Sequence, residues 1–357
     1  LYWLFRQQGK PINRFSLQNL DKNLPGLIEQ ASELRSVAPK GKKVFIFATL
    51  HYWIEHATLM SLALSAQGHD VTLGYLPFCE WRFPINRFDL RRQNAYAKNI
   101  LRKTAPIMNT VSFLSKRAPY VPLSNDIENS VKEVSIFDSQ YTEQIEDIDP
   151  NSEIYKLRYR RNRDAAQSLL AWLRAEKPDV VIVPNGTIME LGICYRVARS
   201  LKIPTTTYEF SDQRNRFWIA QNSEIMRQDT NELWKARIDE KLSAEQLEKV
   251  RALMISRQKA SLFENFSRLW QGIPTQGAEK TRNNLGLDQR SIVLLATNVL
   301  GDSLTLGRQV FTKSMAEWIE RTVQYFVARK DVQLVIRVHP GEIKSRGVSM
   351  VEIIHRL

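Results

Sequence analysis

Residues 44–75 read VFIFATLHYWIEHATLMSLALSAQGHDVTLGY, and this stretch decides the fold class. Its first seven residues are continuously apolar and rich in β-branched and aromatic types, which is typical of a strand buried on both faces. Apolar residues then recur at helical spacing over 57–66, and Gly68 can take the left-handed turn that ends a helix. Residues 71–75 predict a second strand. The stretch therefore predicts a βαβ unit, the building block of a parallel sheet.

Two further units of this kind follow along the chain. Strands predicted at 180–183 and 205–208 flank a helix over 189–200. Strands predicted at 291–296 and 332–338 flank a helix over 315–328. We therefore expect an α/β fold with two Rossmann-type domains and parallel sheets.

Other segments give weaker patterns. Residues 1–40 are polar, with a short helix predicted at 27–35, and residues 87–103 predict a basic helix. Residues 116–150 read as loops and short elements. Helices are also predicted over 155–175 and 240–262, before a linker-like stretch at 265–290 that contains Pro274, Gly272 and Gly277.

The composition excludes several classes of protein. With 43% hydrophobic residues the chain is not mostly disordered, and no apolar run is long enough to predict a membrane-spanning helix. Two cysteines, Cys79 and Cys194, cannot form a disulfide framework. The formal charge of +13 favours acidic partners such as nucleotide phosphates or anionic lipid, but no nucleic-acid-binding motif accompanies it. The basic runs at 87–92 and 158–163 are either solvated helix faces or part of a surface for anionic lipid or an acidic sugar polymer.

Ligands of open parallel sheets bind beyond the carboxyl ends of the strands, so the residues that follow each strand are the candidates. The first strand is followed by His51 and by Glu55-His56. His51 or His56 could act as a general base, with Glu55 orienting the imidazole. The alternative is that His56 starts the helix and packs, while Glu55 decorates its first turn.

Asn185 and Gly186 follow the strand at 180–183, where a sharp turn lets the backbone approach a ligand. Glu190 is either part of that site or a carboxylate favoured by the helix dipole. Glu209 ends the strand at 205–208 and is a second catalytic candidate. The alternative for Glu209 is an ion pair with Arg214 or Arg216.

The last βαβ unit carries two polar turns. Backbone amides of the turn that holds Asn298, Gly301, Asp302 and Ser303 could bind a diphosphate. After the last strand come Arg337, His339 and Glu342. Histidine and arginine suit a phosphate or a nucleobase, and the glutamate suits a pair of ribose hydroxyls.

The stretches VLLATNVLGDS at 293–303 and QLVIRVHPGE at 333–342 resemble the GT-B glycosyltransferases, in particular the bacterial capsule polysaccharide biosynthesis family. MAEWI at 315–319, the segment that runs from KPDV at 177–180 through PNG at 184–186 to Glu190, and the turn GHDV at 68–71 are also similar to such proteins. The likeness covers about residues 42–76 and 177–357 and is most specific in the Arg-x-His-Pro-x-Glu run.

The resemblance implies a metal-independent hexosyltransferase that moves a sugar from a nucleotide-sugar donor to a growing capsular or surface polysaccharide, or to a lipid-linked glycan. It implies no cofactor, no metal site, and a cytoplasmic location at the inner face of the membrane. It places His51, His56, Glu209, Asn185, Gly186 and Glu190 on the catalytic and acceptor side. It places Asn298, Gly301, Asp302, Ser303, Arg337, His339 and Glu342 on the donor side. The alternatives are a nucleotide-sugar 2-epimerase of the same architecture and a non-catalytic basic scaffold that binds glycan or membrane.

We expect an N-terminal extension at 1–40, an acceptor-side Rossmann-like domain at 41–264, a linker at 265–290 and the start of a donor-side domain at 291–357. A complete second domain needs further strands and helices after the His-Pro turn. The sequence therefore predicts a GT-B-like chain whose second domain is incomplete, cut from a protein longer by about 100–150 residues.

Overall fold

The computed structural model describes residues 15–114, 121–211, 216–259, 276–344 and 347–357, without the side chain of residue 344. Contacts between residues divide the chain into two compact units. The first unit contains Leu1–Asp138, Asp149–Glu209 and Ile219–Met226, and the second contains Ser139–Ile148, Phe210–Trp218 and Arg227–Leu357. The expected domain boundaries stay a prediction, and residues 1–14 of the expected extension lie outside the described residues.

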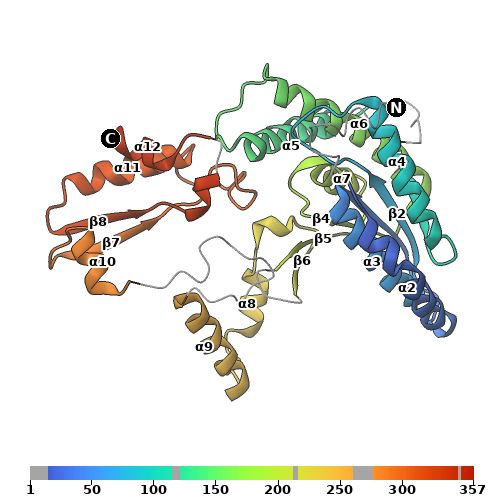
Figure 1. The fold of residues 1–357 in the computed structure, drawn as a ribbon, viewed down its shortest axis with the longest axis horizontal. Coiled ribbons are helices and arrows are strands. Elements are labelled where there is room, and N and C mark those ends of the chain that lie inside the picture. The colour runs from blue at the N-terminus through green and yellow to red at the C-terminus, as the bar shows by residue number, and fades with distance from the viewer. Residues whose placement is uncertain (1–14, 115–120, 212–215, 260–275, 345–346) are drawn as a thin grey trace. The chain divides into compact units, whose positions relative to one another are not determined.

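The first unit is built on a six-stranded sheet with the order β3-β2-β1-β4-β5-β6 (Figure 1). Its strands are Asn109–Ser112, Asp70–Leu76, Lys43–Thr49, Val180–Pro184, Thr205–Phe210 and Phe217–Gln221, in that order. The neighbouring pairs from β3 through β5 run parallel. The predicted α/β class with a parallel sheet is therefore confirmed, and the arrangement is of the Rossmann type.

The βαβ unit that decides the fold is present as predicted, with Val44 of β1 opposite both Val71 of β2 and Val180 of β4. Its helix, α3, runs over His51–Ala66 and begins six residues before the predicted 57. Trp53 and Ile54 are buried and extend the helical spacing of the apolar face back to the strand end. Both candidate histidines therefore lie on one helix.

A glycine and three aromatic rings form the densest part of this core. Phe45 of β1 stacks on Trp172 with 4.2 Å between ring centroids, and Phe113 meets Phe45 edge-on. A Cβ on Gly74 of β2 would lie 2.5 Å from the Phe45 ring and 2.6 Å from the Phe113 ring. The backbone at residue 74 therefore has room for hydrogen alone.

Helices cover the sheet on its two flanks. Helix α3 packs on β1 and β2, and helix α7 (Met189–Ser200) packs on β1 and β4 (Figure 1). Helix α2 (Gln18–Val37) packs on α3, and helix α6 (Glu153–Glu176) packs on α7. Helix α4 spans Arg87–Leu101, close to its prediction, and ends in a 3₁₀ turn at Arg102–Thr104. Helix α2 is longer at both ends than the helix predicted at 27–35, and its earlier start buries Leu20 and Leu24 alongside Ala31.

The prediction of loops over 116–150 is wrong for most of that segment. Helix α5 spans Asn125–Glu143, and the described residues Ile127, Val131, Val134 and Asp138 are buried at a spacing of three to four. The stripe escaped notice because Ser, Asn and Glu residues surround its few apolar members. The edge strand β3 was missed for a related reason, since its sequence NTVS carries one apolar residue.

The second unit contains a two-stranded parallel sheet, β7 (Ser291–Ala296) and β8 (Val332–Arg337), with Ser291 opposite Val332. Helix α11 (Met315–Val327) connects them, so the third predicted βαβ unit is confirmed. Leu295, Leu300, Ile319 and Met350 form its core, the last from helix α12 (Met350–His355).

The helices between the two sheets differ from their predictions. The helix predicted over 240–262 is α9, Ala244–Gln258, preceded by the short α8, Asn231–Arg237. Residues 260–262 lie outside the described residues. Helix α10, Ala278–Asn284, lies inside the stretch expected to be a linker, whose first part, 265–275, is not described. In the part of the chain that the structure describes, none of the helices combines the length and apolarity that crossing a bilayer requires.

Candidate functional site

The order of the first sheet reverses between β1 and β4, which is where open parallel sheets bind ligands. The turns that follow these two strands contain residues with positive φ angles. Leu50 has a φ of 66°, Asn185 of 59°, Gly186 of 80° and Met189 of 56°. Three of these residues are not glycine, so the surrounding packing holds the turns in a conformation that costs free energy.

Asn185 joins the ends of β4 and β5. Its side-chain oxygen accepts hydrogen bonds from the amides of Thr187 and Ile188, at 3.1 and 3.3 Å. Its side-chain nitrogen donates to the Glu209 carboxylate at 3.2 Å. The structure thus brings together two of the candidate residues, and it uses Asn185 to hold the turn. Arg214, one of the two arginines considered for Glu209, lies outside the described residues.

Gly186 occupies the tightest position of this turn. A Cβ at residue 186 would lie 2.6 Å from Cγ2 of Thr207 on the neighbouring strand. With its φ of 80°, only glycine fits here without strain. The predicted sharp approach of the backbone is therefore present, although no ligand role of Gly186 follows from it.

His56 lies in the second turn of α3 against the end of β5. Its Nδ1 is 3.3 Å from the hydroxyl of the buried Tyr208, and the two rings are 5.2 Å apart. Burial lowers the pKa of His56 below its usual value, because the charged imidazolium would lose hydration. Burial also raises the pKa of Tyr208, and the nearby Glu209 charge adds to that shift. His56 is thus held as a neutral imidazole beside a protonated phenol.

Successive side chains of a strand point to opposite faces, so Tyr208 and Glu209 leave β5 in opposite directions. The contact of Tyr208 with His56 and the bond of Glu209 with Asn185 accordingly lie on different faces. His51, at the start of α3, packs edge-on against Phe15 with 6.4 Å between centroids. None of the described contacts links His51 to the pair His56 and Tyr208 or to the pair Asn185 and Glu209.

Glu190 lies in the first turn of α7, as the helix-dipole alternative expected, and its carboxylate is buried inside the unit. Arg158 of α6 donates to it at 3.2 Å, and both side chains are at most 1% exposed. Arg158 also donates to Asp138 at 3.1 Å, and Asp138 accepts the amide of Met189, the first residue of α7. Burial raises the pKa of Asp138, partly offset by the Arg158 charge. This buried network of Arg158, Asp138 and Glu190 fixes the start of α7.

The same network corrects the interpretation of the basic run at 158–163 as solvated. Arg158 is fully buried, and Arg161 is partly buried. Burial, with the Arg158 charge, lowers the pKa of Arg161 to about 10. Arg161 donates to the carbonyls of Glu80 at 2.9 Å and Phe83 at 3.0 Å, and its guanidinium lies 4.6 Å from the centre of the Phe78 ring. These two arginines hold the loop that follows β2.

In the second unit the turns after β7 and β8 are tied together. The amide of Thr297 donates to the carbonyl of Arg337 at 3.1 Å, and the Thr297 hydroxyl accepts the amide of His339 at 3.2 Å. The turn at 297–299 and the turn at 339–341 therefore adjoin, with Val299 3.4 Å from a Cβ built on Gly341. This brings the two parts of the expected donor site to one sheet edge.

The His339 ring has a defined orientation. Its Nδ1 accepts the amide of Gly341 at 3.0 Å, which places the proton of the neutral ring on Nε2. A Cβ on Gly341 would lie 2.9 Å from that Nδ1, so glycine keeps the ring in place. Nε2–H is the group of His339 that can donate to a phosphate oxygen.

The other predicted donor-side residues shape the turns. Asn298 accepts the amide of Val299 at 2.8 Å, and Asp302 accepts that of Leu304 at 2.8 Å. Glu342 accepts the amide of Met350 and so caps α12. Within the described residues, no contact places the side chains of Ser303 and Arg337 in a site, and Arg337 is exposed. Gly301 has a φ of 69°, and a Cβ there would collide with the carbonyl of Gln140.

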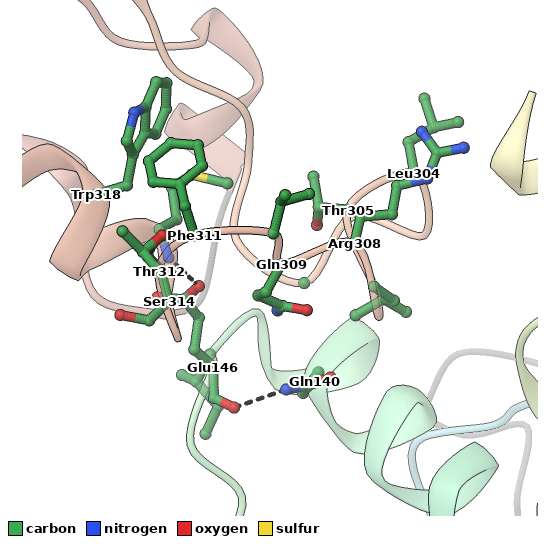
Figure 2. A pocket seen from close by; sticks show the side chains of 15 residues that line it. Gln140, Glu146, Leu304, Thr305, Arg308, Gln309, Phe311, Thr312, Ser314 and Trp318 are labelled. Atoms are coloured by element: carbon green, nitrogen blue, oxygen red, sulfur yellow. Dashed lines mark hydrogen bonds between the residues drawn. The ribbon is translucent and has the colours of Figure 1, made fainter.

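A pocket of about 330 Å³ lies beside Gly301 in the second unit. Figure 2 shows side chains of the loop before α11, such as Phe311 and Thr312, with Trp318 of α11 itself. Gln140 and Glu146 come from α5 and the segment after it. The walls are mainly apolar, and Gln140, Glu146, Arg308 and Gln309 are the larger polar members. The lining further includes Ile145, Leu304, Thr305, Leu306, Val310, Ser314 and Met315.

Glu146 closes the N-terminus of α11 at the edge of this pocket. Its carboxylate accepts the amides of Met315 at 2.5 Å and Ala316 at 3.2 Å. The Ser314 hydroxyl accepts a third amide, that of Glu317, at 3.0 Å. The free amides at the start of a helix can bind an anion, but at α11 the side chains of Glu146 and Ser314 already accept hydrogen bonds from them.

Sequence reasoning missed Tyr208, Arg158, Asp138 and Glu146. Tyr208 ends a predicted strand and could have been found by the rule that singled out Glu209. Arg158 stands between Leu157 and Tyr159 on a helix with buried leucines, which is a weak signal of burial. Asp138 and Glu146 lie in the segment expected to be loops, so no signal in the sequence pointed to them.

Comparison with known proteins gives distant likenesses. No protein-family model and no curated protein matches the chain. It is similar to pantothenate synthetase from Thermus thermophilus, with 11% identity over 64% of this chain and 72% of that chain and a TM-score of 0.29. It is similar to a protein assigned as a UDP-N-acetylglucosamine 2-epimerase from Listeria monocytogenes, with 13% identity over 86% and 66% and a TM-score of 0.26. A glycosyltransferase of kitacinnamycin shares 13% identity over 87% and 71%, with a TM-score of 0.24. With TM-scores this low, these likenesses support no statement about activity.

Proposed function

We propose that the protein is a GT-B-type glycosyltransferase that moves a hexose from a nucleotide-sugar donor to a capsular or surface polysaccharide, or to a lipid-linked glycan. The observation that carries this proposal is the pair of joined turns in the second unit. The two turns follow the parallel strands β7 and β8, so both lie at the carboxyl edge of this sheet. The Thr297 hydroxyl accepts the amide of His339 and joins them. The Arg-x-His-Pro-x-Glu run, which resembles the capsule polysaccharide biosynthesis family, lies in one of these turns.

On the donor side, the leaving group is a nucleoside diphosphate. Nε2–H of His339 donates to a phosphate oxygen, and Arg337, the last residue of β8, supplies a positive charge. Backbone amides of Asn298, Gly301 and Ser303 complete the anion site, while the amide of Asp302 donates to the Val299 carbonyl at 3.3 Å and holds the turn. Glu342 already binds the Met350 amide, so it holds the shape of the second turn. These groups stabilise the developing charge without a metal ion.

On the acceptor side, His56 is the general base. The acceptor hydroxyl oxygen forms a bond to the anomeric carbon, the bond from that carbon to the phosphate oxygen breaks, and the electron pair leaves with the diphosphate. The hydroxyl proton goes to the imidazole, which is neutral because burial lowers its pKa. Asn185 and Glu209, which lie on the other face of β5, hold the turn that follows β4.

The test is a panel of nucleotide sugars given to the protein expressed at its full genomic length, with and without a glycan acceptor and with EDTA throughout. We expect release of free nucleoside diphosphate that depends on the acceptor and survives EDTA. Replacing His339 by Gln removes the oriented donor and lowers kcat by about 100-fold. The matched control is His355→Gln, since His355 is an exposed residue of α12.

Three other outcomes contradict the proposal. Isomerised sugar formed without acceptor identifies an epimerase. Loss of turnover in EDTA, restored by a divalent cation, contradicts metal independence. No turnover with any donor, combined with retained glycan or membrane binding, identifies a scaffold.

A further inference from the structure

Helix α4 and the loop before it carry an unusual charge balance. Between residues 82 and 103 Asp89 is the one carboxylate. Seven cationic residues stand in the same stretch: Arg82, Arg87, Arg91, Arg92, Lys98, Arg102 and Lys103. Lys103 is paired with Asp21 at 2.5 Å, and the remaining excess of positive charge on α4 and its loop fits an anionic partner, since a helix that only needs to be soluble mixes both signs of charge.

The rotation of α4 about its axis is fixed by its inner face. Gln93, Ala97, Ile100 and Leu101 are buried against the first unit. The opposite face contains Phe88, Arg92, Ala95 and Asn99 at spacings of three to four residues, with Arg91 next to Arg92. All five are exposed. An aromatic ring thus lies beside two arginines on the outer face of this helix.

A second aromatic ring extends this surface into the preceding loop. Phe83 is 59% exposed and Phe88 is 50% exposed. The loop is held from behind, because Arg161 donates to the Phe83 carbonyl at 3.0 Å and the Glu80 carboxylate accepts the amides of Trp81 and Arg82 at 2.9 Å each. The exposed rings therefore stand on a fixed backbone.

Exposed phenylalanines among arginines fit one partner better than others. The rings gain free energy on entering hydrocarbon, and the guanidinium groups bind phosphate at the depth of lipid headgroups. An acidic polysaccharide or a nucleic acid satisfies the arginines and can stack on one ring face, whereas a bilayer also provides hydrocarbon that Phe83 and Phe88 can enter. We propose that this surface, made of Phe83, Arg87, Phe88 and Arg91, binds the surface of an anionic lipid bilayer.

The test is co-sedimentation of the purified protein with vesicles in the absence of any nucleotide sugar. We expect binding to phosphatidylcholine vesicles that contain about a third phosphatidylglycerol, and much weaker binding to pure phosphatidylcholine. The variant Phe83→Ser/Phe88→Ser and the variant Arg87→Gln/Arg91→Gln each weaken binding to the anionic vesicles by about tenfold or more. All these positions are exposed, so the variants keep the circular dichroism and melting temperature of the parent.

Matched controls separate this surface from exposed residues elsewhere. Leu233→Ser/Trp234→Ser changes two apolar side chains of α8 that are each 63% exposed, and Lys241→Gln/Arg251→Gln removes two exposed cations. Both controls retain parental vesicle binding.

The proposal is overturned if the wild type binds neutral and anionic vesicles alike, if it binds neither, or if the controls lose as much vesicle binding as the test variants. Binding to an acidic polysaccharide that is indifferent to the phenylalanines, with no vesicle binding, also overturns it. Vesicle binding needs no turnover, so its failure leaves sugar transfer untouched, and the reverse holds.

Discussion

The guanidinium of Arg158 and the carboxylate of Glu190 lie 3.2 Å apart with neither side chain open to solvent. Asp138 shares the same guanidinium at 3.1 Å and also receives the first amide of α7. The turn with Asn185 and Gly186 directly precedes this helix. Through this network the buried Arg158 stabilises the start of α7, and with it the turn at the carboxyl edge of the first sheet.

Replacing Arg158 by Met leaves two buried carboxyl groups without their cation. We expect the free energy of unfolding to fall by about 3–5 kcal/mol, because a buried ion network that loses one partner keeps an uncompensated charge. Urea unfolding at pH 7 measures the loss. The control is Arg160→Met on the exposed side of α6, which changes stability by at most about 0.5 kcal/mol. Equal stability of the two variants would contradict a structural role of the network.

Gly186→Ala tests the turn after β4. The new Cβ meets Thr207 Cγ2 at 2.6 Å and also imposes a φ of 80° on alanine, so we expect a loss of about 1–3 kcal/mol. The second change Thr207→Ser removes Cγ2 but keeps the hydroxyl that donates to Ser223, and it restores part of the loss. Gly277→Ala, at a φ of 85° with no neighbour within 4 Å, isolates the backbone cost. If Gly186→Ala lowers the free energy of unfolding no more than Gly277→Ala does, the close approach to Thr207 does not contribute to the loss.

His56 predicts a specific dependence of stability on pH. Its pKa is lowered in the folded protein, so below the ordinary histidine pKa of about 6.5 the unfolded chain binds the proton more readily. The stabilisation is complete above that value and is lost as the pH falls through the folded pKa. We expect the difference in unfolding free energy between pH 7.5 and pH 5.5 to be smaller in His56→Gln than in the wild type. The exposed His355→Gln keeps the wild-type difference. A slope unchanged by His56→Gln would mean that the burial of this imidazole is not coupled to folding.

Glu146→Ala tests the capping of α11. The amides of Met315 and Ala316 lose their acceptor, so their hydrogen exchange becomes faster and the second unit loses about 1 kcal/mol of stability. Exchange measured by mass spectrometry on peptides from the start of α11 reports both effects. Asp147→Ala, an exposed neighbour, is the control and leaves these amides as they are. Unchanged protection in Glu146→Ala would show that Ser314 alone is a sufficient cap.

The three βαβ units were predictable because the parallel strands are continuous apolar runs, both in the buried strand at 44–50 and in β7 at 291–296, where Leu295 is buried and Val293 and Leu294 are exposed. Helix α5 was not predictable, since its stripe of Ile127, Val131 and Val134 is thin and its fourth inward residue is the charged Asp138. The charges at the candidate sites were visible in the sequence, but their partners were not. Arg158 and Asp138 are 20 residues apart and meet only through the packing of α5 on α6.

Gly74 constrains how this sequence can drift over evolutionary time. The rings of Phe45 and Phe113 occupy the space that a side chain at 74 would need. A larger residue at 74 is acceptable only after one ring has become smaller, whereas a ring that shrinks first leaves a cavity of its own. The three positions are thus epistatic: each substitution changes which of the others is tolerated. Paired exchanges of small for large among 45, 74 and 113 are the expected mark of this core in any set of homologous chains.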